Sequence, residues 1–397
     1  MKNFVLISPN FPKTYYQFAQ ELKRAGFRVL AISYESYDNL SYELRDSLTE
    51  YYKVNSLENY DEVYRAMAYF SYKYGHIDFV ESNNEYWLQL DARLRTDFNI
   101  TTGRNSKNLI AFQSKELEKK YYMKAGVKTA RYVIPTYYKK AKEFIDEVGY
   151  PVVVKPVVGV GAAKTYKINN LKELKEYFNN KPNVRYIMEE FVPGEIISFD
   201  GVADKDANVV FSSNEVFPVS VMDVVNEKKD FLCYSNKEMP KDLEEIGKRV
   251  IKAFNARYRY FHLEFFRLYE DKKGLGKKGE IIALETNMRC PGGYTPDVIN
   301  FSKSVSSYRI FAETMADLKT TENLDAKKYY TAYVGRRYGK QYEMSNEDIY
   351  REYGSKIVMH DIMPSILASD MGDESYVIKV DTLDEVNDFF KKLTKTR

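Results

Sequence analysis

Two neighbouring segments with strand-like composition constrain the fold of this sequence more than any other feature. Tyr260–Tyr269 is rich in aromatic residues, Ile281–Leu284 is a short apolar run, and the Gly- and Lys-rich turn Asp271–Gly279 lies between them. This pattern predicts a β-hairpin. The hairpin would bring the carboxylates of Glu264 and Glu285 close together. Two carboxylates on apolar strands repel each other unless a cation lies between them.

The second strand ends in polar residues that suit a cation and an anion. Side chains alternate along a strand, so Glu285, Asn287 and Arg289 are predicted to share one face. Mg²⁺ takes hard oxygen ligands, and Arg binds phosphate or carboxylate oxygens in a bidentate manner. These residues alone leave a surface ion pair open as an alternative. His262 shares the face of Glu264, and we expect it to be packed or hydrogen-bonded rather than a ligand.

Length and composition limit the class of protein. A chain of 397 residues predicts two or three domains, and 44% hydrophobic with 29% charged residues is typical of a globular protein. A net charge of +3 argues against a dedicated nucleic-acid binder. The two cysteines, Cys233 and Cys290, form no disulfide framework, so a cytoplasmic location is expected. No signal peptide and no membrane-spanning segment is predicted.

The order of predicted elements divides the chain into parts. The N-terminal part alternates strands and helices, which predicts a parallel α/β sheet, and its first strand–helix turn lacks a Gly-rich dinucleotide fingerprint. From about residue 150 the pattern is β-rich. Pro218–Pro240 is predicted to be irregular, Ser302–Asp317 to be a helix, and Tyr329–Arg397 to be a small α+β tail. The predicted N-terminal elements are strands Phe4–Ser8, Phe27–Ser33 and His76–Glu81, and helices Tyr15–Ala25, Tyr60–Tyr74 and Trp87–Asp97.

Two further segments suit a nucleotide. Lys155 ends an apolar strand, where a bare ammonium is costly without an anion, and Gly159–Ala163 is a small-residue loop whose amides can fold over phosphates. The loop matches neither a Walker nor a Rossmann motif, and an ordinary β-turn remains open. Tyr186–Gly194 is a strand running into a Pro-Gly turn. Its backbone can pair with an adenine edge, although an edge strand with a structural turn is the alternative.

Taken in order, these segments resemble the ATP-grasp superfamily, of the carboxylate–amine ligase type, over roughly Ser114–Leu318. The matching motifs are a Lys-bearing helix with Lys115, then PVVVKPVVGVGAA, MEEFVPGEIISFDG, HLEFF and EIIALETNMRCPGG. The resemblance implies a multidomain α/β and α+β protein: an N-terminal parallel α/β domain, an ATP-grasp fold and a small C-terminal lobe. The expected domains are residues 1–112, residues 113–320 with a lid-like subdomain at about 113–190, and residues 321–397.

The resemblance also implies ATP and Mg²⁺ as cofactors, with Mn²⁺ able to substitute. The implied nucleotide contacts are two lysines that bind the phosphates, a loop that covers the phosphates, a hinge beside the adenine and one residue at the ribose. In that order, they are Lys115 and Lys155; Gly159, Gly161 and Ala162; Glu189, Glu190, Phe191 and Val192; and Glu195. Glu195 is included because Ile196 stands where the family usually has the ribose-binding Glu. Either Glu195 makes that contact, or the ribose is held differently.

The implied metal ligands are Glu264, Glu285 and Asn287. Arg289 matches the catalytic cation beside the acyl phosphate, and the substrate contacts are Arg289, Gly292 and Gly293. The sequence shows no Ser/His/Asp or Cys/His arrangement that would provide a nucleophile.

The implied reaction is phosphorylation of a carboxylate by ATP, followed by attack of an amine on the acyl phosphate, forming a dipeptide or amino-acid conjugate and ADP. Two alternatives stay open: a biotin carboxylase-like or carbamoyl-phosphate-like enzyme that uses bicarbonate, and a non-catalytic nucleotide-binding regulatory protein. The expected partners are a small-molecule carboxylate and amine, with no nucleic acid and no membrane. A homodimer remains open.

Overall fold

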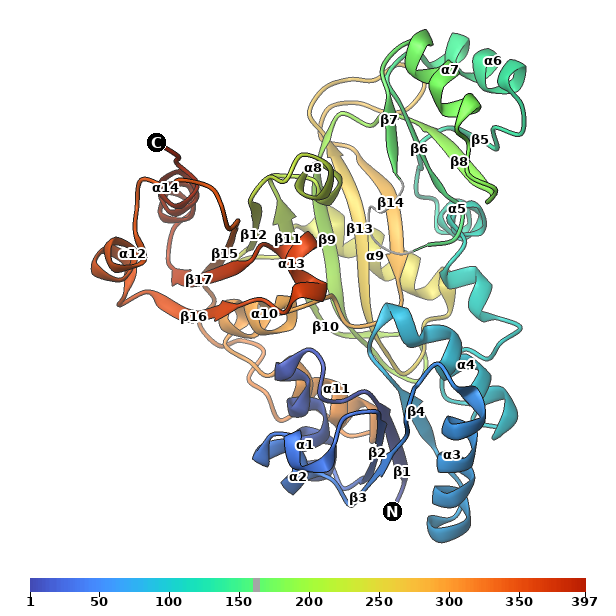
Figure 1. Ribbon diagram of the computed structural model, residues 1–397, viewed down its shortest axis with the longest axis vertical. Helices are drawn as coiled ribbons and strands as arrows, with labels where there is room; N and C mark the ends of the chain where they lie inside the picture. The colour runs from blue at the N-terminus through green and yellow to red at the C-terminus, as the bar shows by residue number, and fades with distance from the viewer. Residues whose placement is uncertain (160–164) are drawn as a thin grey trace.

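The computed structural model describes residues 1–159 and 165–397. Its N-terminal part is a parallel sheet with strand order β3-β2-β1-β4, which confirms the predicted α/β architecture (Figure 1). Strands β1 and β2 are almost wholly buried because helices cover a sheet made of Val, Leu and Ile. The elements are β1 (Asn3–Ile7), α1 (Tyr16–Arg24), β2 (Arg28–Ser33), α2 (Tyr42–Ser47), β3 (Glu50–Lys53), α3 (Tyr60–Tyr74), β4 (Phe79–Glu81) and α4 (Leu88–Asp97).

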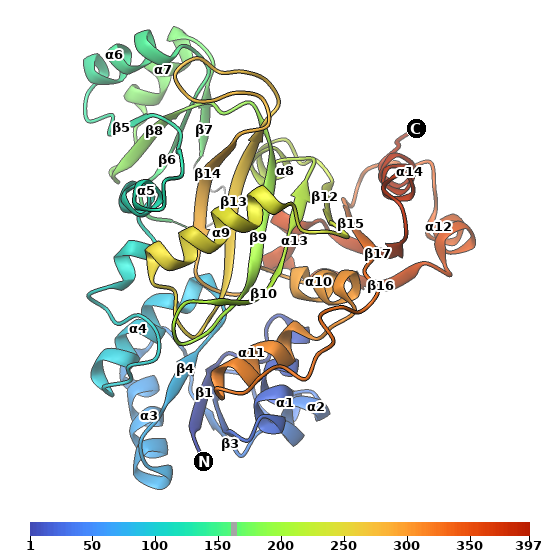
Figure 2. The same ribbon diagram turned by 180° about the vertical axis from the view of Figure 1, so that it is seen from behind.

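The largest sheet is antiparallel and forms the centre of the molecule. Its strand order is β14-β13-β9-β11-β12-β15-β17-β16, and β10 pairs with β9. Helix α9 covers one face, in front of the sheet in Figure 2. Gly247 permits this close packing, since a β-carbon there would lie 2.3 Å from the ring of Phe199. The elements up to the hairpin are β9 (Gly194–Ala203), β10 (Val209–Ser213), β11 (Glu215–Phe217), α8 (Val221–Asn226), β12 (Phe231–Ser235), α9 (Lys241–Phe254), β13 (Arg259–Leu268) and β14 (Ile281–Asn287).

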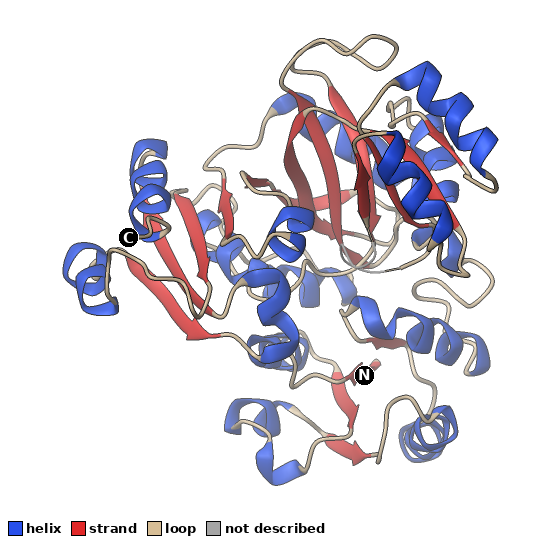
Figure 3. Ribbon diagram, turned by 45° about the horizontal axis from the view of Figure 1, so that its top comes forward, coloured by secondary structure: helices blue, strands red, loops and turns tan. Residues whose placement is uncertain are grey.

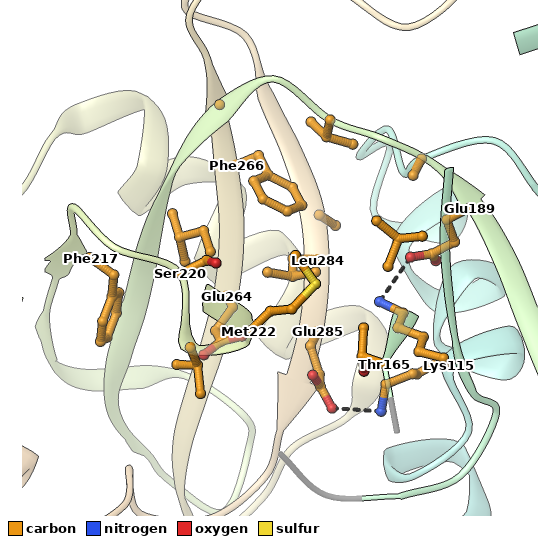
Figure 4. A pocket seen from close by; sticks show the side chains of 18 of the residues that line it. Lys115, Thr165, Glu189, Phe217, Ser220, Met222, Glu264, Phe266, Leu284 and Glu285 are labelled. Atoms are coloured by element: carbon orange, nitrogen blue, oxygen red, sulfur yellow. Dashed lines mark hydrogen bonds and ion pairs between the residues drawn. The ribbon is translucent and has the colours of Figure 1, made fainter. Parts of the chain in front are cut away.

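The predicted hairpin is present as β13 and β14. Glu264 lies opposite Glu285, and the register shifts between Glu264 and Phe265, so Leu284 is the additional residue of a β-bulge. The bulge changes the simple alternation and turns both Leu284 and Glu285 towards the cavity described below (Figure 4).

A smaller sheet, with order β5-β8-β6-β7, packs with two helices beyond the tip of the central sheet (Figures 1 and 3). Its core is the apolar face of α6 and α7 against β6 and β8. The elements are α5 (Lys115–Lys124), β5 (Tyr132–Val133), α6 (Tyr138–Val148), β6 (Val152–Pro156), β7 (Tyr166–Ile168), α7 (Leu171–Asn179) and β8 (Tyr186–Glu190).

The prediction that Pro218–Pro240 is irregular is wrong. This segment contains helix α8, whose Ser220 cap accepts a hydrogen bond from the amide of Asp223 at 3.1 Å, and strand β12. Both elements are short, and their flanking residues are polar. Their residues therefore show too little periodicity for either element to be recognised from the sequence.

The predicted helix Ser302–Asp317 contains all of α11 (Ser307–Met315) but overlaps only the end of α10 (Thr295–Lys303), because the left-handed backbone at Ser304 (φ 54°) ends α10 there. The C-terminal strands continue the central sheet, because β15 pairs with β12. The domain boundaries given above stay a proposal. The remaining elements are α10 (Thr295–Lys303), α11 (Ser307–Met315), β15 (Tyr330–Arg336), α12 (Asn346–Tyr353), β16 (Ile357–Ile362), α13 (Ser365–Met371), β17 (Glu374–Val380) and α14 (Leu383–Leu393). Within the described residues, no helix combines the length and apolar character that crossing a bilayer requires.

Candidate active site

A cavity of about 460 Å³ lies between the small sheet and the β13–β14 hairpin, with the β11–α8 segment along one side (Figure 4). It brings together residues that are far apart in sequence. Phe217, Ser220 and Met222 of the β11–α8 segment also line it, and the sequence analysis did not find them. The predicted site residues that line this cavity are Lys115, Lys155, Gly159, Glu189, Glu190, Phe191, Val192, Glu264, Glu285, Asn287, Arg289 and Gly292.

Two predicted site residues within the described part of the chain, Glu195 and Gly293, do not line the cavity. Glu195 is on β9 opposite Arg267, and its neighbours Gly194 and Ile196 line the cavity instead. Strand alternation thus directs Glu195 to the other face of the sheet, away from the position expected for a ribose contact. Gly161 and Ala162 lie outside the described residues.

Gly293 has a different structural role. Its φ is +58°, and a β-carbon there would lie 2.1 Å from the sulfur of Met371 on α13. A glycine is therefore required for packing against α13, whereas Gly292 lies at the cavity.

The proposed metal ligands lie on adjacent strands. Glu264 faces Glu285 across the hairpin, and His262 faces Asn287. No group of three or more His, Cys, Asp or Glu side chains in residues 1–159 and 165–397 is arranged to hold a metal ion. Two carboxylates and one amide oxygen fit Mg²⁺, which keeps positions for phosphate oxygens and water.

Lysine and glutamate side chains form ion pairs along one wall of the cavity. The Nζ atom of Lys115 is 2.9 Å from Oε1 of Glu285 (Figure 4), and both Lys155 and Lys119 contact Glu189, at 2.8 and 2.6 Å. Burial raises the pKa of the Glu189 carboxyl, but the two ammonium groups outweigh it and lower this pKa to about 2. Lys115 and Lys155 are thus held by carboxylates, and an incoming phosphate must compete for them.

The hinge residue Glu190 has a structural partner. Its carboxylate is fully buried and pairs with Arg131 at 2.7 Å, and it also accepts a hydrogen bond from the Arg131 amide at 2.8 Å. The side chain of Glu190 therefore fixes the end of β8 against the segment before β5. The backbone of Glu190–Val192 remains at the cavity.

His262 is hydrogen-bonded, as predicted. Its Nδ1 contacts the buried Asp200, and its Nε2 is 3.2 Å from Oε1 of Glu264. Burial lowers the pKa of His262, but Asp200 and Glu264 raise it to about 10. The imidazole is therefore positively charged at neutral pH and holds the Glu264 carboxylate in place.

Arg289 has a partner that the sequence analysis did not identify. Its Nε atom donates to Oε2 of Glu85 at 3.0 Å, and Nη1 donates to the carbonyl of Cys290 at 2.8 Å. Burial raises the pKa of the Glu85 carboxyl. Glu85 opens a 3-10 helix, Glu85–Trp87, just after β4. Its place beyond the carboxyl end of a parallel strand, where ligands commonly bind, was the available signal.

The fold and the cavity indicate the class of protein. Residues 117–260 match the family described as "ATP-grasp domain", and the chain carries an ATP-grasp domain. Over 230 residues it is 24% identical to the L-arginine-specific L-amino acid ligase of Bacillus subtilis, a match covering 56% of this chain and 53% of that protein. The chain spans about half the length of the curated relatives it matches.

Solved structures share the fold over nearly the whole chain. An L-amino acid ligase from Bacillus licheniformis has a TM-score of 0.69 at 14% identity, covering 98% of this chain and 96% of that one. The biotin carboxylase domain of a 2-oxoglutarate carboxylase from Hydrogenobacter thermophilus, solved with MgADP and bicarbonate, has a TM-score of 0.69 at 17% identity, covering 98% and 89%. At these identities the likeness establishes the fold alone.

Proposed function

We propose that this protein is an ATP- and Mg²⁺-dependent ligase that activates a carboxylate as an acyl phosphate and joins it to an amine, releasing ADP and phosphate. The substrates we propose are amino acids, giving a dipeptide or an amino-acid conjugate. The similarity to an L-amino acid ligase over about half of the chain supports this choice of substrate class.

One observation carries the proposal: a single cavity contains the lysines Lys115 and Lys155, the carboxylates Glu264 and Glu285, and Arg289. Lysines suit phosphates, paired carboxylates suit a divalent cation, and Arg suits a second anion. A site for nucleotide alone has no need for the second anion position.

The residues supply positioning and charge rather than covalent chemistry. Glu264, Glu285 and Asn287 would hold Mg²⁺, which neutralises charge on the triphosphate and orients it when bound. Arg289 holds the substrate carboxylate so that one oxygen attacks the γ-phosphorus while ADP leaves. Lys115 and Lys155 stabilise the charge that develops on the phosphoryl oxygens.

The direct test is a screen for ADP release with ATP, MgCl₂ and all pairs of the twenty L-amino acids, with the coupled product identified by mass spectrometry. The proposal predicts release that needs two amino acids and yields equal amounts of ADP, phosphate and product. Release of ADP with bicarbonate alone would favour a carboxylase-like function. Nucleotide binding without release under any of these conditions would favour a regulatory protein.

The proposed partners are these small molecules. The biotin carboxylase domain named above was solved as a dimer. We extend the proposal to a homodimer here, which light scattering of the purified chain would test.

A further inference from the structure

A second cavity, of about 250 Å³, adjoins the first and differs from it in charge. It lies between the N-terminal part of the chain and helix α5. The two cavities share Glu85, Gly159, Glu285 and Asn287. A molecule in the second cavity would therefore meet the contents of the first at these residues.

Carboxyl groups line both cavities, whereas the cationic side chains among the described residues line only the first. The first contains cations, including Lys115, Lys155 and Arg289. None of the described residues that line the second is Lys, Arg or His; it has carboxyl groups from Glu85, Glu118 and Glu285, and amides from Gln89 and Gln113. Burial raises the pKa of the Glu118 carboxyl to about 8, so the negative charge here comes from Glu85 and Glu285, and it favours a cation that donates hydrogen bonds over an anion.

Three carboxyl groups in the second cavity have different partners. Glu118 accepts a hydrogen bond from the Thr286 amide at 3.2 Å, and Glu285 is a proposed metal ligand paired with Lys115. Glu85 is paired with Arg289, which lines the first cavity and not the second. A substrate carboxylate bound in a bidentate manner through Nε of Arg289 would displace Glu85, which would then need another cation.

We propose that the second cavity is the binding site for the amine substrate, which enters as a primary ammonium ion and is held by Glu85. This inference rests on the proposed ligase function and adds to it the location and charge of the amine. The exchange at Arg289 also places amine binding after carboxylate binding, because only then is Glu85 free.

The amine then reacts with the acyl phosphate. The ammonium loses one proton to solvent and its nitrogen bonds to the acyl carbon. The bond from that carbon to the phosphate oxygen breaks, and phosphate leaves with the electron pair. The second proton lost by nitrogen goes to the departing phosphate, giving the amide and hydrogen phosphate.

Gln89→Lys tests the proposal, because Gln89 is exposed and lines only the second cavity, so its replacement adds a cation there. With the most active amino-acid pair from the screen, the KM for the amine should rise about tenfold at low salt, and less at high salt. Gln341→Lys, the same change at an exposed position outside both cavities, is the matched control. An unchanged amine KM in Gln89→Lys would overturn the inference.

An assay with hydroxylamine in place of the amine distinguishes failure of the proposed amine site from failure of the proposed ligase function. Hydroxylamine is largely uncharged at neutral pH and traps acyl phosphates, so it reports carboxylate activation without an ammonium. In Gln89→Lys, kcat/KM for the amine should fall about tenfold more than kcat/KM for hydroxylamine. Equal losses overturn the amine site. Absence of hydroxamate with every amino acid, in the wild-type protein, overturns the ligase function instead.

A second measurement needs no turnover. Both native cysteines are buried, so Gln89→Cys provides a single accessible thiol. The thiol is treated separately with a cationic ethylammonium methanethiosulfonate and with the anionic ethylsulfonate reagent, and the ratio of the two reaction rates is measured. This cation-to-anion rate ratio should be about tenfold higher for Gln89→Cys than for free 2-mercaptoethanol. A ratio equal to that of the free thiol would show that the cavity does not favour cations and would overturn the inference.

Discussion

The Nε atom of Arg289 lies 3.0 Å from Oε2 of Glu85, although 204 residues separate the two in sequence. The pair joins the end of the β13–β14 hairpin to the N-terminal α/β part. In this state the guanidinium that we assign to the substrate carboxylate is already paired. A substrate carboxylate that binds Arg289 in a bidentate manner through Nε would replace Glu85, which would couple carboxylate binding to a change at the contact between the two parts of the chain.

Replacing Arg289 by Lys tests its role in the reaction. A lysine keeps the charge but forms no bidentate contact, so Arg289→Lys should lower kcat by roughly 10²–10³-fold and change nucleotide affinity by less than about twofold. Turnover, ATP affinity and melting temperature are measured on the same variant. Arg267→Lys, on the same hairpin, alters an ion pair with Asp242 of α9 and is the control. Full turnover, or lost stability without a selective catalytic loss, would contradict the assignment.

Glu285→Gln should leave the fold intact and lower Mg²⁺-dependent ADP formation by roughly 10²–10³-fold, because a neutral amide is a poor ligand beside a triphosphate. Circular dichroism and coupled ADP assays measure the two properties. Glu280→Gln, just before the same strand and paired with the exposed Lys128, should behave as wild type. The metal assignment fails if the Glu285→Gln protein turns over at the wild-type rate.

Lys155→Ala should weaken binding of a non-hydrolysable ATP analogue by at least about tenfold, and carboxylate binding much less, since the ammonium is assigned to the phosphates. Isothermal titration calorimetry measures both affinities. Glu189 keeps Lys119 as a partner in this variant, so its charge stays compensated. Lys172→Ala, at an exposed position on α7, is the control. Unchanged affinity for the analogue would remove Lys155 from the site.

Glu189 should make stability depend on acid pH. Its folded-state pKa, about 2, lies below its ordinary value of 4.5, so its contribution is present above pH 4.5 and is lost as the pH falls towards 2. The shift corresponds to on the order of 3 kcal/mol. Urea unfolding at pH 7, 5 and 3 should show Glu189→Gln less stable than wild type at pH 7, with the difference shrinking below pH 4.5.

Glu143→Gln, at an exposed position on α6, should show no comparable pH dependence. A Glu189→Gln deficit that stays constant from pH 7 to pH 3 would mean that the two lysines do not lower the pKa of this carboxyl.

The sequence alone determined the local elements and the types of residue at the cavity. Helix Tyr60–Tyr74 was predicted to the residue, because hydrophobic periodicity is a property of neighbouring residues. The hairpin was predicted from two strand-like segments and the Gly- and Lys-rich turn between them, and it carries Glu264, Glu285, Asn287 and Arg289 to one cavity.

Only the tertiary structure decided which side chains meet across long separations. The pairing of Arg289 with Glu85, the two lysines on Glu189, and helix α8 beside the cavity depend on contacts between separate parts of the chain. Glu195 illustrates the limit at short range, because one residue of strand register decides whether Glu195 or Ile196 faces the cavity. Periodicity records which residues share a face, but the packing of one element on another determines what that face contacts.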